Sequence, residues 1–139
     1  MRKGIQKSSM GYSVLVVDDD RELRKIYRAL LERVGYTIYE ASNGAEALQL
    51  LTTQKMVPDV MIMDMLMPLL NGDALIQRVR QTPALDPMKI IILSAYPRYR
   101  ESAQHFQADL FLVKPINPDE LLQALAALVS PRAANEKLA

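Results

Sequence analysis

The chain has 139 residues, of which 50% are hydrophobic and 24% charged, and it contains no cysteine. One domain takes roughly 100–200 residues, so the length excludes a catalytic domain joined to a separate DNA-binding domain. The lack of cysteine excludes disulfides and cysteine-ligated zinc or iron–sulfur sites, and a cytoplasmic location is the default expectation.

The charges are unevenly distributed. Five of the 17 basic residues, but only one of the 16 acidic ones, lie in residues 1–10 and 131–139, which leaves residues 11–130 with 12 bases and 15 acids. A mildly acidic body is a poor surface for nucleic acid, since duplex binding relies on clustered Lys and Arg. No apolar stretch is long enough for a signal-peptide core or a membrane span. We therefore expect neither a nucleic acid nor a membrane as a partner.

Short apolar runs rich in β-formers alternate with helical patterns along the chain. The first run, residues 13–17, is followed by apolar positions at helical spacing up to Gly35, which predicts the end of that helix. A second strand is expected at residues 36–39. The Asn43-Gly44 pair is compatible with a β-hairpin, but the apolar residues after it have helical spacing, which favours a helix.

Three further strand–helix units follow. We expect strands at residues 60–64, 89–93 and 110–113, and helices around residues 75–79, 99–106 and 118–129. Asn117 and Pro118 are typical of an N-cap and a first helical position. Five such units with nearly continuous apolar strands predict an α/β fold, with a parallel sheet covered by helices on both faces.

Polar residues stand at the carboxyl ends of the predicted strands, where ligands bind in open parallel sheets. They are Asp18-Asp19-Asp20, Asp64, Ser94 and Lys114. Several carboxylates in one small site need a counterion, and hard oxygen ligands favour Mg²⁺ together with phosphate oxygens. In such a site Asp64 is a candidate nucleophile, Lys114 would neutralise phosphoryl oxygens, and Ser94 would donate a hydrogen bond.

Over residues 12–130 the chain resembles the receiver domain of bacterial two-component response regulators. The resemblance rests on residues 14–20, residues 64–68 with Gly72 four positions further on, residues 93–95 and residues 113–115. It implies a flavodoxin-like fold, a doubly wound five-stranded parallel sheet with strand order 2-1-3-4-5. Residues 1–11 would then be a basic flexible N-terminal tail, and residues 131–139 a C-terminal tail or the start of a linker.

The same resemblance implies roles for individual residues. Asp64 would be the phosphoacceptor, and Lys114 would pair with the acyl phosphate. Asp18, Asp19, Asp64 and the backbone carbonyl of Leu66 would hold Mg²⁺, directly or through water. Ser94 and Phe111 would form the switch, with Phe111 turning inward when Ser94 is drawn to the phosphoryl group. The family commonly has a cis peptide before the proline that matches Pro115. Ser94 and Phe111 stand where Thr and Tyr are more frequent, and the loss of the Tyr hydroxyl implies a looser switch.

By this likeness, a sensor histidine kinase or phosphotransfer protein would supply the phosphoryl group, and the chain would catalyse only its own phosphorylation and dephosphorylation. The readout would be a changed face formed by the helix at residues 99–106, the strand at 110–113 and the final helix. A downstream protein or an output domain outside this sequence would bind that face. The likeness also allows a phosphorylation-dependent homodimer, although the final helix lacks the Arg-rich pattern of receivers that dimerise ahead of a winged-helix domain.

Two other functions compete with this interpretation. A haloacid-dehalogenase-like phosphohydrolase also uses an aspartyl nucleophile and Mg²⁺, but on the first strand, and residues 18–22 lack the last position of its motif. A receiver-like binding module would act without phosphorylation.

Other motifs have simpler interpretations. The alternating Met61, Met63, Met65 and Met67 resemble a thioether copper site, but core packing is expected. The segment at residues 96–100 mixes Tyr and Arg as single-strand nucleic acid binders do, yet a solvated helix start or partner face is favoured. His105 is expected on a helix surface, away from the strand ends, and Asp20 as a helix cap.

Overall fold

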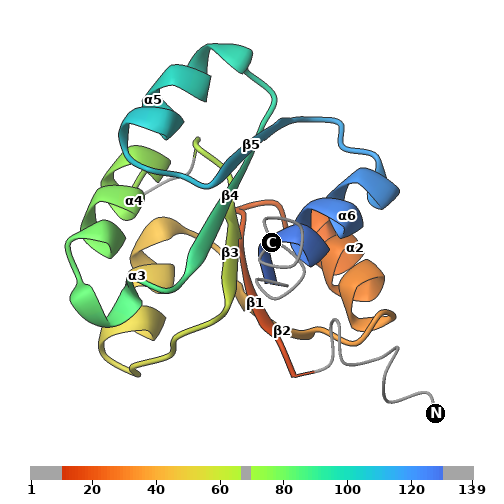
Figure 1. Cartoon of the computed structure of the whole chain (residues 1–139), viewed down its shortest axis with the longest axis horizontal. Helices are drawn as coiled ribbons and strands as arrows, with labels where there is room; N and C mark the ends of the chain where they lie inside the picture. Colours follow the sequence, from red (N-terminus) through yellow and green to blue (C-terminus); the bar gives the residue numbers. More distant parts are fainter. Residues whose placement is uncertain (1–10, 67–69, 130–139) are drawn as a thin grey trace, which may run out of the picture.

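The computed structural model of the chain describes residues 11–66 and 70–129 (Figure 1). Strands and helices alternate in it as β1 (Ser13–Val17), α2 (Arg21–Glu32), β2 (Thr37–Ala41), α3 (Gly44–Thr52), β3 (Val60–Met63), α4 (Gly72–Arg80), η1 (Pro83–Leu85), β4 (Lys89–Ser94), η2 (Pro97–Tyr99), α5 (Arg100–His105), β5 (Leu110–Val113) and α6 (Pro118–Val129). Apart from Gly11, the predicted tails at residues 1–11 and 131–139 lie outside the described residues, as do Met67 and Pro68.

The five strands form one parallel sheet in the order β2-β1-β3-β4-β5, which confirms the predicted fold. Neighbouring strands end almost in register, because Val17 pairs with Met63 and Met63 with Ile92. On the far side, Ser94 of β4 pairs with Val113 of β5. The residues that follow β1, β3 and β5 therefore meet at one edge of the sheet.

Helices cover both faces of this sheet, with α3, α4 and α5 on one side and α2 and α6 on the other (Figure 1). Alternate residues of each strand point to opposite faces, so that Leu15, Met61 and Met63 pack toward α3 and α4, whereas Val14 and Ile62 pack toward α2 and α6. Burying one such side chain stabilises the fold by roughly 1.5–3 kcal/mol. The methionines of β3 are therefore core residues, as predicted.

Side chains that accept backbone hydrogen bonds set the starts of the helices. Asp20 caps α2, Asn43 caps α3 and Asn71 caps α4. At α6, the Asn117 side chain accepts from the amides of the second and third residues of the helix, at 2.8 and 3.3 Å. Each cap contributes about 1 kcal/mol. Because Asn43 caps a helix, the pair Asn43-Gly44 begins α3 and closes no hairpin.

Strands β3 and β4 each differ from the predicted bounds by one residue, and two other elements differ by more. Strand β2 begins at Thr37 and runs to Ala41, because the chain leaves α2 through Gly35, whose φ is +103°, and Tyr36 still bonds back to that helix. The helix expected at residues 99–106 is split into the 3-10 turn η2 and the six-residue α5. Pro97 opens the first and Gln107, with a φ of +70°, follows the second.

His105 is exposed on α5, as predicted. None of the helices in the described part of the chain has the length and apolar character needed to cross a membrane.

Candidate functional site

Four strands place the predicted site residues at one edge of the sheet. Asp18 follows β1, Asp64 follows β3, Ser94 ends β4 and Lys114 follows β5. The structure brings the side chains of Asp18, Asp64 and Lys114 into direct contact, whereas the hydroxyl of Ser94 bonds elsewhere.

The Lys114 ammonium lies between two carboxylates. Its Nζ donates to Asp64 Oδ2 at 2.9 Å and to Asp18 Oδ2 at 3.3 Å. Burial acts to lower the pKa of Lys114, but the hydrogen bond to Asp64 and the charges of both carboxylates outweigh it and raise that pKa. The ammonium therefore stays charged at neutral pH. With both carboxylates ionised, one negative charge remains uncompensated within this group.

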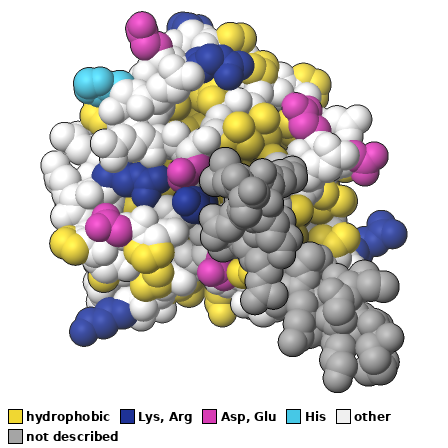
Figure 2. Space-filling model, in the orientation of Figure 1, with side chains coloured by type: hydrophobic (Ala, Val, Ile, Leu, Met, Phe, Trp, Pro, Cys, Tyr) yellow, Lys and Arg dark blue, Asp and Glu magenta, His cyan; other side chains and the backbone are white. Residues whose placement is uncertain are grey.

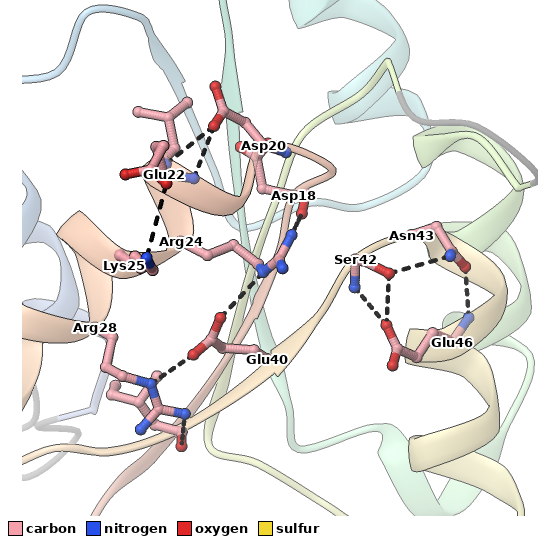
Figure 3. A network of polar contacts seen from close by, with 12 residues as sticks. Asp18, Asp20, Glu22, Arg24, Lys25, Arg28, Glu40, Ser42, Asn43 and Glu46 are labelled. Carbon is pink, nitrogen blue, oxygen red and sulfur yellow. Dashed lines mark hydrogen bonds and ion pairs between the residues drawn. The ribbon is translucent and has the colours of Figure 1, made fainter.

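Asp18 is only 4% exposed, and its carboxylate also accepts a hydrogen bond from the Asp20 amide at 2.9 Å. Burial raises the pKa of Asp18, although that amide and Lys114 oppose the shift. From α2, Arg24 donates to the backbone carbonyl of Asp18 at 2.6 Å and to Glu40 of β2 at 3.0 Å (Figure 3). Arg24 thus ties the residue after β1 to the neighbouring helix and strand. Sequence reasoning missed this role, because no local pattern marks which arginine of a helix turns toward a strand end.

The loop after β3 holds the carboxylate of Asp64 from the other side. The Leu66 amide donates to Asp64 Oδ1 at 3.2 Å, and the Gly72 amide donates to the Met65 carbonyl at 2.9 Å. A Cβ at Gly72 would lie 2.8 Å from the Met65 Cα and 3.2 Å from the Asp64 carbonyl oxygen. The absence of a side chain at Gly72 therefore allows α4 to approach the phosphoacceptor candidate closely. The sequence singled out Gly72 only through the family resemblance.

The donor atoms at this edge suit a hard divalent cation. Asp19 is exposed directly after Asp18, and Leu66 is 45% exposed beside Asp64. Within residues 11–66 and 70–129, no three His, Cys, Asp or Glu side chains converge closely enough to hold a metal ion by themselves. Mg²⁺ does not require such a cage, since it keeps several waters and usually takes one or two carboxylates. The oxygen donors and the uncompensated negative charge therefore fit Mg²⁺.

The two predicted switch residues are both buried. Ser94 is inaccessible to solvent, and its Oγ accepts from the Tyr96 amide at 3.0 Å and donates to the Tyr96 carbonyl at 3.4 Å. Phe111 is 6% exposed in the core on the α3, α4 and α5 side, and the Arg100 guanidinium lies 4.8 Å above its ring. The peptide bond between Lys114 and Pro115 is cis, as the resemblance implies. The sequence singled out Arg100 only as part of the segment at residues 96–100 and did not connect it with Phe111.

Comparison with known proteins identifies the family. The model of the response regulator receiver domain matches residues 14–126. An uncharacterized 14.6 kDa protein of Leptolyngbya boryana is 38% identical over 112 residues, which cover 79% of this chain and 84% of that protein. Response regulator MprA of Mycobacterium ulcerans is 35% identical over 122 residues, which cover 86% of this chain but 51% of MprA. The chain thus spans about half the length of that regulator.

A solved structure has the same fold. The response regulator protein TrrA from Thermotoga maritima, in complex with Mg²⁺-BeF, superimposes with a TM-score of 0.74 at 34% identity, over 84% of this chain and 98% of TrrA. Apart from Ser13, the first residue of β1, the matched segment holds all five strands and the residues that end them. The chain therefore belongs to the receiver domain family of two-component response regulators.

Proposed function

We propose that the chain accepts a phosphoryl group from the phosphohistidine of a sensor histidine kinase or phosphotransfer protein, and that Asp64 is the acceptor. The observation that carries this proposal is the Lys114 ammonium, which lies 2.9 Å from Asp64 and 3.3 Å from Asp18. A fixed ammonium beside a half-buried carboxylate is placed to stabilise negative charge on an incoming phosphoryl group.

The transfer exchanges one bond to phosphorus for another. A carboxylate oxygen of Asp64 attacks the phosphorus, the phosphorus–nitrogen bond of the phosphohistidine breaks, and the imidazole leaves. Lys114 stabilises the charge on the phosphoryl oxygens. Asp18, Asp19, Asp64 and the Leu66 carbonyl would hold Mg²⁺, directly or through water, and the ion would supply Lewis-acid neutralisation of those oxygens. In the later hydrolysis, water attacks the phosphorus, the bond between phosphorus and the Asp64 oxygen breaks, and inorganic phosphate leaves, which restores the carboxylate.

The readout begins at the switch residues. The Ser94 hydroxyl donates a hydrogen bond to the phosphoryl group in place of the Tyr96 carbonyl. Phe111 then repacks in the space beside Ser94. This changes the face formed by α5, β5 and α6, which binds a downstream protein or an output domain. Such a response is a two-state repacking driven by a local change in charge.

The phosphohydrolase alternative is disfavoured. Its nucleophile would be Asp18, which is 4% exposed and already bonded to the Asp20 amide and to Lys114. The match of residues 14–126 to the receiver family also favours phosphotransfer. The remaining alternative, a binding module that acts without phosphorylation, is distinguished by the experiment below.

The test is phosphorylation by acetyl phosphate in the presence and absence of Mg²⁺, read by mass spectrometry and by mobility on a phosphate-affinity gel. We expect Mg²⁺-dependent labelling of the wild type and none of Asp64→Asn. Asp86→Asn is the matched control, because Asp86 is exposed in the turn before β4 and makes the same change in charge. Full labelling of Asp64→Asn would identify a different acceptor, and an unlabelled wild type would favour the phosphorylation-independent module.

A further inference from the structure

An arginine held between two tyrosines lies on the surface just after β4. The Arg98 guanidinium carbon is 4.6 Å from the ring centroid of Tyr96 and 4.9 Å from that of Tyr99. The two rings meet edge to face at 6.1 Å and 85°. We call these three residues the arginine clamp. Arg98 is exposed and Tyr96 is 42% exposed, so the clamp is open to solvent.

Arg98 differs from Arg24, Arg28 and Arg80 in the partners of its charge. Arg24 and Arg28 pair with Glu40, and Arg80 pairs with Asp109. Within the described part of the chain, Arg98 makes no ion pair and no side-chain hydrogen bond; its contacts are with the faces of aromatic rings. Ring contacts of this kind occupy none of the N–H groups of a guanidinium, which remain able to bind a carboxylate in bidentate geometry.

We propose that the arginine clamp binds carboxylates on an acidic segment of a partner protein. Tyr and Arg are the residue types that most often dominate binding at protein interfaces. Contact with two nearly perpendicular rings holds the guanidinium in place, so that less side-chain freedom is lost on binding. The clamp adjoins α5, which belongs to the face proposed above to change on phosphorylation. The part of this inference that makes the clamp respond to phosphorylation therefore rests on the proposed function.

The backbone of Tyr96, one of the clamp residues, is hydrogen-bonded to the candidate switch residue Ser94. Both the amide and the carbonyl of Tyr96 bond to Ser94 Oγ, at 3.0 and 3.4 Å. If Ser94 turns toward a phosphoryl group on Asp64, the backbone that carries the first ring of the clamp loses both bonds. Binding of the acidic segment therefore responds to phosphorylation.

Single-stranded nucleic acid is disfavoured as the ligand. Binding to a polyanion depends on several bases spread along its backbone, whereas residues 11–130 carry 15 acids and 12 bases. Figure 2 shows Lys and Arg side chains scattered among acidic and hydrophobic ones on the visible face, without a continuous basic track.

The test is selection of a displayed library of random short peptides on the immobilised full chain, followed by titration of the winning peptide. We expect enrichment of Asp and Glu, and a roughly tenfold loss of affinity in Arg98→Ala, which corresponds to about 1.4 kcal/mol. Tyr96→Leu should cost about threefold to fivefold through loss of one cation–π contact. Arg33→Ala is the matched control, because Arg33 is also exposed and makes no ring contact or ion pair within the described residues.

The proposal is overturned if the selected peptides show no acidic enrichment, or if Arg98→Ala binds them as Arg33→Ala does. It is also overturned, in favour of nucleic acid, if a labelled oligothymidylate binds more tightly than the peptides and depends on Arg98. The selection uses no phosphoryl donor, so it does not depend on the proposed function. Adding beryllofluoride with Mg²⁺ should change the peptide affinity of the wild type but not of Ser94→Ala. An unchanged wild type would refute control by phosphorylation while the peptide binding stands.

Discussion

Replacing Gly72 by alanine tests how closely α4 must approach the loop after Asp64. Two effects of opposite sign compete in Gly72→Ala. The substitution restricts the unfolded chain, which on its own stabilises a protein by about 0.4–1 kcal/mol. The added Cβ, however, would lie 2.8 Å from both the Cα and the Sδ of Met65, and 3.2 Å from the Asp64 carbonyl oxygen. The sulfur can rotate away, but the two backbone atoms can move only if the loop moves.

Overpacking of this kind costs typically about 1–3 kcal/mol, so the steric effect wins. We expect Gly72→Ala to lower the free energy of unfolding by about 1 kcal/mol and the melting temperature by about 3–5 °C. Urea titration followed by far-UV circular dichroism measures the first quantity, and acetyl phosphate labelling reports the displaced loop as a reduced yield.

A control variant, Ala45→Gly, measures the difference between alanine and glycine in a helix where no close contact is involved. Ala45→Gly changes an exposed residue in the first turn of α3, and should destabilise by about 0.5–1 kcal/mol through backbone entropy. If Gly72→Ala is instead more stable than the wild type by a similar amount and labels normally, the close-packing argument is wrong.

Three other perturbations have expected outcomes. The hydrogen bond from Arg28 lowers the pKa of Glu40 by more than the partial burial of Glu40 raises it. The ionised Glu40 therefore stabilises the fold above the ordinary pKa of a glutamate, and this stabilisation is lost as the pH falls through the lowered pKa of the folded state. Glu40→Gln should therefore lower the free energy of unfolding, measured by urea titration at pH 7, by about 0.5–1 kcal/mol. That free energy should also fall less steeply with decreasing pH than in the wild type, and an unchanged pH profile would contradict this. The chain has two phenylalanines, so fluorophenylalanine labelling gives two fluorine NMR signals. Arg100→Ala should shift and broaden the signal of Phe111, because the cation–π contact is lost. A narrow, unshifted signal would show that Arg100 does not hold the ring. In Lys114→Met the carboxylates of Asp18 and Asp64 lose their ammonium partner, so adding Mg²⁺ should raise the melting temperature by more than it does in the wild type. An equal rise in the two proteins would mean that other groups compensate the charge of the carboxylates.

All the strands except β2 were predictable to within one residue, because buried parallel strands consist of continuous apolar runs. Residues 89–93 are such a run, and in the structure β4 begins at the same residue and extends by one, to Ser94. The convergence of Asp18, Asp64 and Lys114 followed from the same logic, since the carboxyl ends of parallel strands share one edge.

The partners of the candidate switch residues, Ser94 and Phe111, were not predictable from the sequence. The Ser94 hydroxyl can rotate, and its bonds to Tyr96 depend on how the chain turns at Pro97, which no periodicity encodes. Arg100 and Arg24 have long side chains with many rotamers, so only the packed structure shows that one covers Phe111 and the other reaches the carbonyl of Asp18.

The contact between Lys114 and Asp18 joins residues that lie 96 positions apart, and Lys114 and Asp64 are separated by 50. During synthesis the amino-terminal parts of a chain emerge first, so both carboxylates leave the ribosome well before the lysine. Until β5 docks beside β4, the two carboxylates lack the ammonium that holds them together. A nascent, truncated or partly unfolded copy therefore carries every acidic residue of the site and still lacks the assembled group. The group formed by Asp18, Asp64 and Lys114 is therefore assembled only once β5 has taken its place in the sheet.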